Sequence, residues 1–249
     1  MKRILTLLLC LTLLTPCLAE GRLTDEELQG FYRHSIFVGD SIPRMLWNYI
    51  KDVRKTQPEY FPDIKFYTSY NYQLYTARLK SASTKRVNLV YKGRELSLYE
   101  IVQILSPRRV FILAGVNDAV ALNPERGLTY TEETVATLRE ADPGLDIYFF
   151  SLTPVTQKVE NEHHYQAKWD AYNALLEEKC AELGVGYIDI ATDLKDEETG
   201  LMKKGISSDG KYHLNASGNA IWAQTLLDWA QRQYEQGVWT PADNNIEPW

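Results

Sequence analysis

Three polar segments of the chain carry the side chains that nucleophilic attack on a carbonyl requires. Ser41 offers a hydroxyl, and His213 offers an imidazole that could take its proton. Asp209, four residues before His213, could hold the ring tautomer and favour the imidazolium. The amide of Asn117 could donate a hydrogen bond to an oxyanion. Taken singly, each has an ordinary alternative: a helix cap, a surface-loop histidine or a turn residue.

The elements predicted around these residues would bring them to one edge of a sheet. Apolar runs predict strands at residues 35–38, 64–67, 110–114, 147–151 and 185–190. Helical patterns lie at 43–50, 99–105, 131–140, 165–183 and 216–233, and we expect Thr131 or Thr129 to cap the helix at 131–140. Strands that alternate with helices indicate a parallel sheet covered on both faces. Such sheets place their sites at the carboxyl ends of the strands. Ser41, Asn117 and Thr153 follow the first, third and fourth strands, so we expect all three near this edge.

The amino-terminal segment differs from the rest of the chain. Residues 1–19 have a basic start, an uncharged apolar run at 4–14 and a small residue, Ala19, before the expected cut. This is the layout of a signal peptide, and the run is short for a membrane-spanning helix. We therefore expect cleavage after Ala19, secretion, and no stable membrane insertion afterwards. Residues 20–249 show no linker or repeat and predict a single domain.

The net charge and the cysteine content limit which binding partners and which chemistry the protein can have. Loss of Lys2 and Arg3 with the leader leaves 25 basic against 33 acidic residues, a net charge of −8. An acidic surface argues against nucleic acid or anionic membrane as a partner. Only Cys180 remains after cleavage, in a helical pattern, and we expect a buried, inert thiol. The chain has no phosphate-binding loop, dinucleotide fingerprint or metal-ligand spacing, so we expect no cofactor and no metal.

Three blocks in order resemble the SGNH (GDSL) hydrolase family. The blocks are Val38-Gly39-Asp40-Ser41-Ile42, Gly115-Val116-Asn117-Asp118 and Asp209-Gly210-Lys211-Tyr212-His213. The resemblance covers most of residues 35–230. It implies a three-layer α/β/α sandwich with a flavodoxin-like parallel sheet of five strands, and it implies ester hydrolysis through an acyl-serine.

The resemblance also assigns roles to residues. Ser41 would attack, His213 would take and return the proton, and Asp209 would orient His213. The Ser41 N–H and the Asn117 side chain would bind the oxyanion. Asp40 and Asp118, beside the functional residues, would hold their loops.

Two departures from the family pattern bear on the site. Three residues separate Asp209 from His213, where the family has two. The family's glycine after the second strand, which supplies a further oxyanion donor, is absent. The backbone N–H of Ser69 or of Tyr70 could replace it, and the sequence does not choose between them.

The sequence therefore predicts a secreted serine esterase acting on a small-molecule or glycan ester. Sixteen Tyr and six Trp favour a carbohydrate substrate carrying O-acetyl groups, with lipid esters, thioesters and other esters as alternatives. The two departures keep open a non-catalytic glycan-binding protein on the same scaffold. An acyltransferase using the same serine is a third hypothesis. A hairpin predicted around Lys92-Gly93-Arg94 would border the cleft.

Overall fold

A parallel sheet of five strands forms the centre of the protein. In the computed structural model, which describes residues 21–244 and 249, the strands are β1 (Ser35–Gly39), β2 (Ile64–Thr68), β5 (Arg109–Leu113), β6 (Asp146–Phe150) and β7 (Gly186–Ile188). Their order across the sheet is β2-β1-β5-β6-β7. Counted along the chain this is the flavodoxin-like order 2-1-3-4-5, so the predicted fold is confirmed. The predicted signal peptide lies outside the described residues.

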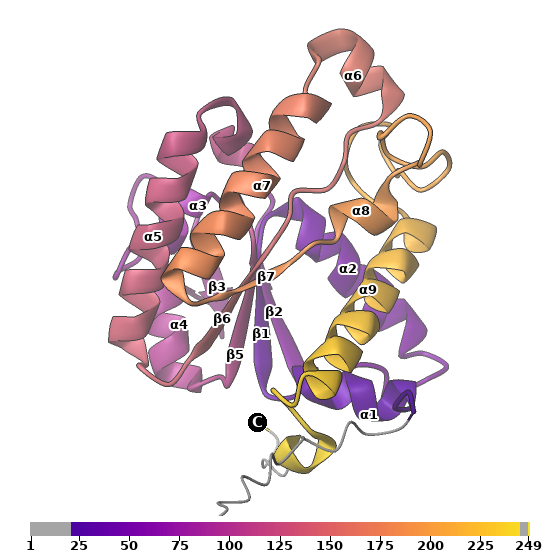
Figure 1. Cartoon of the computed structure of the whole chain (residues 1–249). Coiled ribbons are helices and arrows are strands. Elements are labelled where there is room, and N and C mark those ends of the chain that lie inside the picture. Colours follow the sequence, from indigo (N-terminus) through magenta and orange to yellow (C-terminus); the bar gives the residue numbers. More distant parts are fainter. Residues whose placement is uncertain (1–20, 245–248) are drawn as a thin grey trace, which may run out of the picture.

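Helices cover both faces of the sheet and make the three layers visible in Figure 1. One face carries α3 (Leu74–Ala77), α4 (Leu98–Leu105), α5 (Pro124–Ala141) and α7 (Gln166–Leu183). The other carries α1 (Asp25–Gln29), α2 (Ser41–Val53), α8 (Ala191–Leu194) and α9 (Ala216–Glu235). A further helix, α6 (Gln157–His163), stands beyond the carboxyl edge of the sheet. No helix within the described part of the chain is long and apolar enough to cross a membrane.

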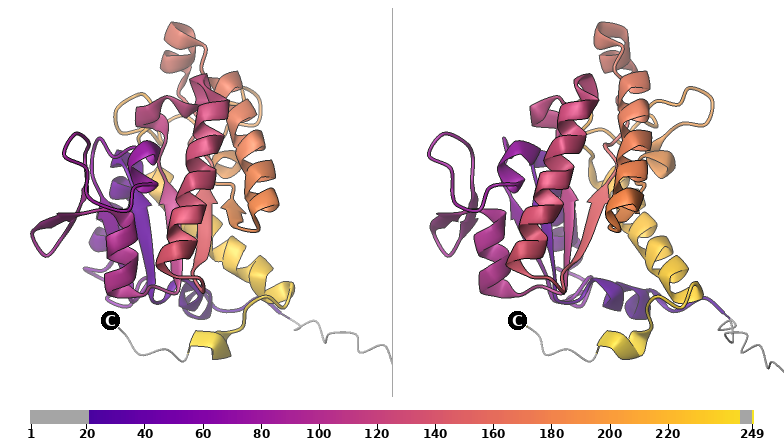
Figure 2. Two further views of the ribbon diagram at one scale, coloured as in Figure 1. Left: turned by 90° about the vertical axis from the view of Figure 1, so that its left-hand side faces the viewer. Right: turned by 60° about the vertical axis from the view of Figure 1, so that its left-hand side comes forward.

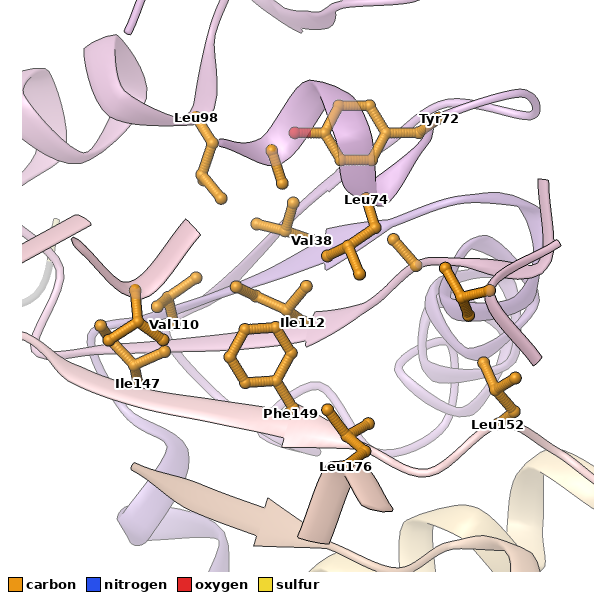
Figure 3. Packing of buried hydrophobic residues seen from close by; sticks show 14 of the residues in the cluster. Val38, Tyr72, Leu74, Leu98, Val110, Ile112, Ile147, Phe149, Leu152 and Leu176 are labelled. Atoms are coloured by element: carbon orange, nitrogen blue, oxygen red, sulfur yellow. The ribbon is translucent and has the colours of Figure 1, made fainter. Parts of the chain in front are cut away.

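The alternation of side chains along each strand separates the core into two layers. Ile112 and Phe149 point to the face covered by α4, α5 and α7, where they pack with Val38 (Figure 3). Their chain neighbours Phe111 and Phe150 point to the other face, towards α2 and α9. Because both faces are buried, the strands read as continuous apolar runs in the sequence.

The predicted hairpin is present and stands out from the domain. It consists of β3 (Leu89–Tyr91) and β4 (Arg94–Leu96), which pair antiparallel. Figure 2 shows it projecting away from the body of the molecule.

The helix predicted at 131–140 starts earlier than expected. It begins at Pro124, and the side chain of Asn123 caps it by accepting a hydrogen bond from the Arg126 N–H. Thr129 and Thr131, expected near the cap, lie inside the helix, where their hydroxyls donate to carbonyl groups four residues earlier. Proline at the first helical position explains the earlier start, because its missing N–H would have no helical partner there.

Candidate active site

Ser41 lies where β1 passes into α2, at the carboxyl edge of the sheet. Gly39 is required just before it, since a Cβ there would lie 1.9 Å from the carbonyl oxygen of Leu113. Asp40 caps the helix by accepting a hydrogen bond from the Ile42 N–H at 2.9 Å. Ser41 is the first helical residue and is half-buried, and its own N–H belongs to the first turn, where no intrahelical acceptor exists.

His213 and Asp209 approach Ser41 from the loop before α9. The Ser41 hydroxyl lies 2.7 Å from His213 Nε2. On the other side of the ring, His213 Nδ1 lies 2.6 Å from Asp209 Oδ2. These contacts form a continuous hydrogen-bond relay from carboxylate to hydroxyl. Ser41, His213 and Asp209, predicted from the sequence to act together, are therefore brought into contact.

The extra residue between Asp209 and His213 is accommodated by the conformation of the loop. Gly210 takes a φ of +70°, which glycine adopts without strain. The Ser208 N–H donates to the His213 carbonyl at 2.9 Å and closes the loop. Asp209 Oδ1 accepts from the Lys211 N–H at 2.8 Å, so the second carboxylate oxygen fixes the loop that carries the histidine.

Two threonines after β6 fasten this loop to the sheet. The buried Thr153 donates its hydroxyl proton to the carbonyl of Tyr212, beside His213, at 3.2 Å. Thr156 donates its hydroxyl proton to the carbonyl of Gly210 at 2.6 Å and its N–H to that of Lys211 at 2.9 Å. Thr153 was expected at this edge from its place after the fourth strand. Thr156 was missed, because nothing in the sequence pairs it with residue 210.

The carboxylates of the site have opposite pKa shifts. Partial burial acts to raise the pKa of Asp209, but hydrogen bonds from His213 and the Lys211 N–H outweigh burial and lower it. Asp209 is thus an anion at neutral pH, as an orienting group for imidazolium must be. Asp40 is 1% exposed, and burial raises its pKa to about 7 in spite of the hydrogen bond from the Ile42 N–H. Its second oxygen has no hydrogen-bond partner among the described residues.

Asn117 lies at the same edge, after β5, with its side chain engaged. Its Nδ2 donates to the carbonyls of Tyr70 and Tyr72, at 3.3 and 3.1 Å. Both amide hydrogens therefore have acceptors in this state of the site. The neighbouring Asp118 is buried and accepts from the Leu74 N–H at 2.6 Å, which ties the segment after β2 to the segment after β5.

Two backbone N–H groups could replace that of the missing glycine, and only one of them is free of a hydrogen bond within the described residues. The Ser69 N–H donates to the Gly39 carbonyl at 3.0 Å and so continues the ladder between β1 and β2. The Tyr70 N–H has no hydrogen-bond acceptor among the described residues. The Tyr70 side chain is 56% exposed, and its ring lies 4.6 Å from the guanidinium carbon of Arg44. It borders the site without filling it.

A run of aromatic rings extends from the base. Tyr212 lies next to His213 with ring centroids 4.9 Å apart, Trp169 lies 5.7 Å from Tyr212, and Tyr165 lies 6.5 Å from Trp169. His163 stacks on Tyr165 at 4.9 Å. These rings mostly contact one another, which explains part of the high aromatic content by packing.

The family model of GDSL-like lipases and acylhydrolases matches residues 37–221, which contain the whole relay. This chain belongs to that family. It is therefore an ester-acting hydrolase of the SGNH/GDSL type. No curated protein matches the chain.

Solved structures of low sequence identity share the fold. A GDSL-like lipase from Bacteroides thetaiotaomicron is 16% identical, with a TM-score of 0.60 over 85% of this chain and 92% of that one. The periplasmic domain of a lipopolysaccharide acetyltransferase from Salmonella ser. Paratyphi A is 16% identical, with a TM-score of 0.54 over 79% and 83%. An acetyl xylan esterase from Geobacillus stearothermophilus is 15% identical, with a TM-score of 0.52 over 79% and 93%.

Proposed function

We propose that this GDSL-family protein is an exported serine esterase that works through an acyl-Ser41 intermediate. The observation that carries the proposal is the relay itself, with 2.7 Å between Ser41 Oγ and His213 Nε2 and 2.6 Å between His213 Nδ1 and Asp209 Oδ2. Both distances are within hydrogen-bond reach, which is the first requirement for a general base and its orienting group. The relay also supports catalysis over a purely binding role, because the wider spacing of Asp209 and His213 does not keep their side chains apart.

The reaction would proceed in two halves. His213 Nε2 takes the proton of Ser41 as Oγ attacks the ester carbonyl, and Asp209 stabilises the imidazolium. The tetrahedral intermediate collapses to acyl-Ser41 while His213 returns the proton to the departing alcohol. A water molecule, deprotonated by His213, then attacks the acyl-serine, and the acid leaves as Ser41 recovers its proton.

Three donors would stabilise the oxyanion. The Ser41 N–H belongs to the positive end of α2. The Tyr70 N–H would replace that of the missing glycine. Asn117 would exchange the longer of its two contacts, the 3.3 Å bond to the Tyr70 carbonyl, for the oxyanion. This exchange gives a hydrogen bond that strengthens only as charge develops, which is what accelerates a reaction.

The cleft beside Asn117 favours a polar, hydrated substrate over a lipid. Its walls include the polar side chains of Asn71, Gln73, Ser83 and Thr84. An ester on a carbohydrate fits such a lining, with an O-acetyl group as the simplest acyl part. Export rests on the amino-terminal sequence pattern alone, and amino-terminal sequencing of the protein recovered from a secreting bacterial host would test cleavage after Ala19.

The decisive experiment measures hydrolysis of p-nitrophenyl acetate by residues 20–249. Ser41→Ala and His213→Ala should each abolish turnover, whereas the exposed-residue controls Ser81→Ala and His163→Ala should not. A fluorophosphonate probe should label the unmodified protein and not Ser41→Ala. Normal turnover in Ser41→Ala would refute the mechanism. Transfer of the acetyl group to an added alcohol in place of water would identify an acyltransferase.

A further inference from the structure

A polar cavity opens beside Asn117, where the segment leading into the hairpin meets the domain. Its volume is about 630 Å³, and Lys85, Arg86 and Glu95 lie in its wall. A smaller hollow of about 220 Å³ shares Arg86 and Asn117 with it and adds Arg126. We call the two together the basic groove. It begins at a residue of the proposed oxyanion site, so a substrate bound at Ser41 could extend into it.

The two arginines of the groove have donors to spare. Arg86 donates to Gln73 Oε1 at 3.1 Å, and Arg126 donates to the backbone carbonyl of Asp118 at 3.0 Å. A guanidinium has five N–H donors, so each of these contacts uses a small part of its capacity. Within residues 21–244 neither arginine forms a salt bridge. The nearby Arg78 differs, because it pairs with Glu133 at 2.8 Å.

The two acidic residues of the groove, Glu95 and Asp118, accept hydrogen bonds from neutral groups of the chain. Glu95 accepts a hydrogen bond from Asn88 Nδ2 at 2.9 Å. Asp118 is buried and its carboxylate accepts backbone N–H groups. Burial raises the pKa of Asp118, while Arg126 and Arg86 act in the opposite direction, so both cations lie close to the same point. The groove therefore has more cationic than anionic side chains, whereas the chain without residues 1–19 has a net charge of −8.

Arg86 is also held in place from one side. Its guanidinium carbon lies 5.2 Å from the ring centroid of Tyr75, and Arg78 lies 4.1 Å from the same ring. Stacking and the contact with Gln73 restrict the arginine without neutralising it. A restricted guanidinium that forms no salt bridge among the described residues is suited to bind a carboxylate or phosphate through two parallel hydrogen bonds.

We propose that the basic groove binds an anionic group of the substrate, a carboxylate or a phosphate, so that the preferred ester is an acidic one. The proposal rests on the proposed function for the ester part and on Arg86 and Arg126 for the anionic part. It deepens the assignment of a polar substrate: the groove selects the charged neighbour of the ester, and Ser41 acts on the ester itself.

The test measures binding and so does not depend on turnover. Calorimetric titration of the Ser41→Ala protein would compare trigalacturonate, which carries carboxylates, with the neutral trisaccharide xylotriose. At low ionic strength trigalacturonate should bind about tenfold more tightly or better, and added salt should reduce the difference. Inorganic phosphate, titrated separately, distinguishes the two anions: binding of phosphate without binding of trigalacturonate would assign the groove to a phosphate group.

The matched variants locate the effect. Arg86→Gln combined with Arg126→Gln should remove the preference for the anion, whereas Arg94→Gln, at an exposed position in β4, should keep it. Thermal unfolding checks that the variants are folded. If neither anion binds more tightly than xylotriose, or if the preference survives the double substitution, the proposal is wrong. Anion binding in a protein without esterase activity would refute the proposed function and leave the groove assignment standing.

Discussion

Replacing Asp209 by Asn isolates the charge at the end of the relay. Asn keeps an oxygen that can accept from the Lys211 N–H and the Ser207 hydroxyl, which lie 2.8 and 3.2 Å from Asp209 Oδ1, so the loop should keep its shape. The negative charge is lost, and the new NH₂ group faces His213 Nδ1. That donor favours the tautomer with hydrogen on Nε2, which cannot take the Ser41 proton.

The size of the effect follows from distance and exposure. The side chains of His213 and Asp209 are 22% and 32% exposed, so water screens the pair in part. With charge centres about 4 Å apart and an effective dielectric constant of about 20 to 40, the imidazolium loses about 2 to 4 kcal/mol of stabilisation. This corresponds to a fall of about 30- to 1000-fold in kcat/KM.

The assay is steady-state hydrolysis of an acetate ester at neutral pH. Asp196→Asn is the matched control, because Asp196 also accepts a backbone N–H in an exposed loop and does not contact the relay. Circular dichroism would check the fold of both variants. A loss smaller than about threefold in Asp209→Asn would refute the reasoning, because the relay would then work without its carboxylate.

Three further outcomes are expected. Burial raises the pKa of Asp40 to about 7, so the folded protein retains a proton that the unfolded chain releases near pH 4, and stability from this group is present at low pH and lost as pH rises through 7. The free energy of unfolding in urea should therefore fall between about pH 5 and about pH 8, and Asp40→Asn should remove about 3 kcal/mol of that decline. Tyr70→Pro, which removes the proposed oxyanion N–H, should lower kcat about 100-fold, and Tyr70→Ala far less; equal losses in both would contradict the assignment to the backbone. Cys180 is buried, with a pKa raised by burial to about 12, so a thiol reagent should modify it only after unfolding; rapid labelling of the native protein would contradict this.

The strands and the residues of the relay could be predicted because each is marked by a short sequence pattern. A strand covered on both faces is a continuous apolar run, and Ser41 follows the first such run directly. The order of the three blocks then placed Asn117 and His213 at the same edge. The predicted start of α5 was wrong. Thr129 and Thr131 were interpreted as caps, whereas the helix begins at Pro124, whose side chain favours the first helical position.

Other features of the site depend on contacts between distant segments. The choice between Ser69 and Tyr70 follows from the bond between the Ser69 N–H and the Gly39 carbonyl, which links neighbouring strands. Thr156 reaches the carbonyl of residue 210 across 54 positions of sequence. The engagement of the Asn117 amide with Tyr70 and Tyr72 is of the same kind. Neither amino-acid composition nor hydrophobic periodicity predicts hydrogen bonds between such distant residues.

The relay also relates activity to folding. Asp209 and His213 share a short loop, but the hydrogen bond from His213 to Ser41 joins residues 172 positions apart. It forms when the segment before α9 returns to the start of α2, which closes one of the long loops of the described chain. During refolding, therefore, recovery of hydrolysis should coincide with completion of the whole domain and lag behind early helix formation. The rate at which hydrolysis recovers would then report the rate of the last step of folding.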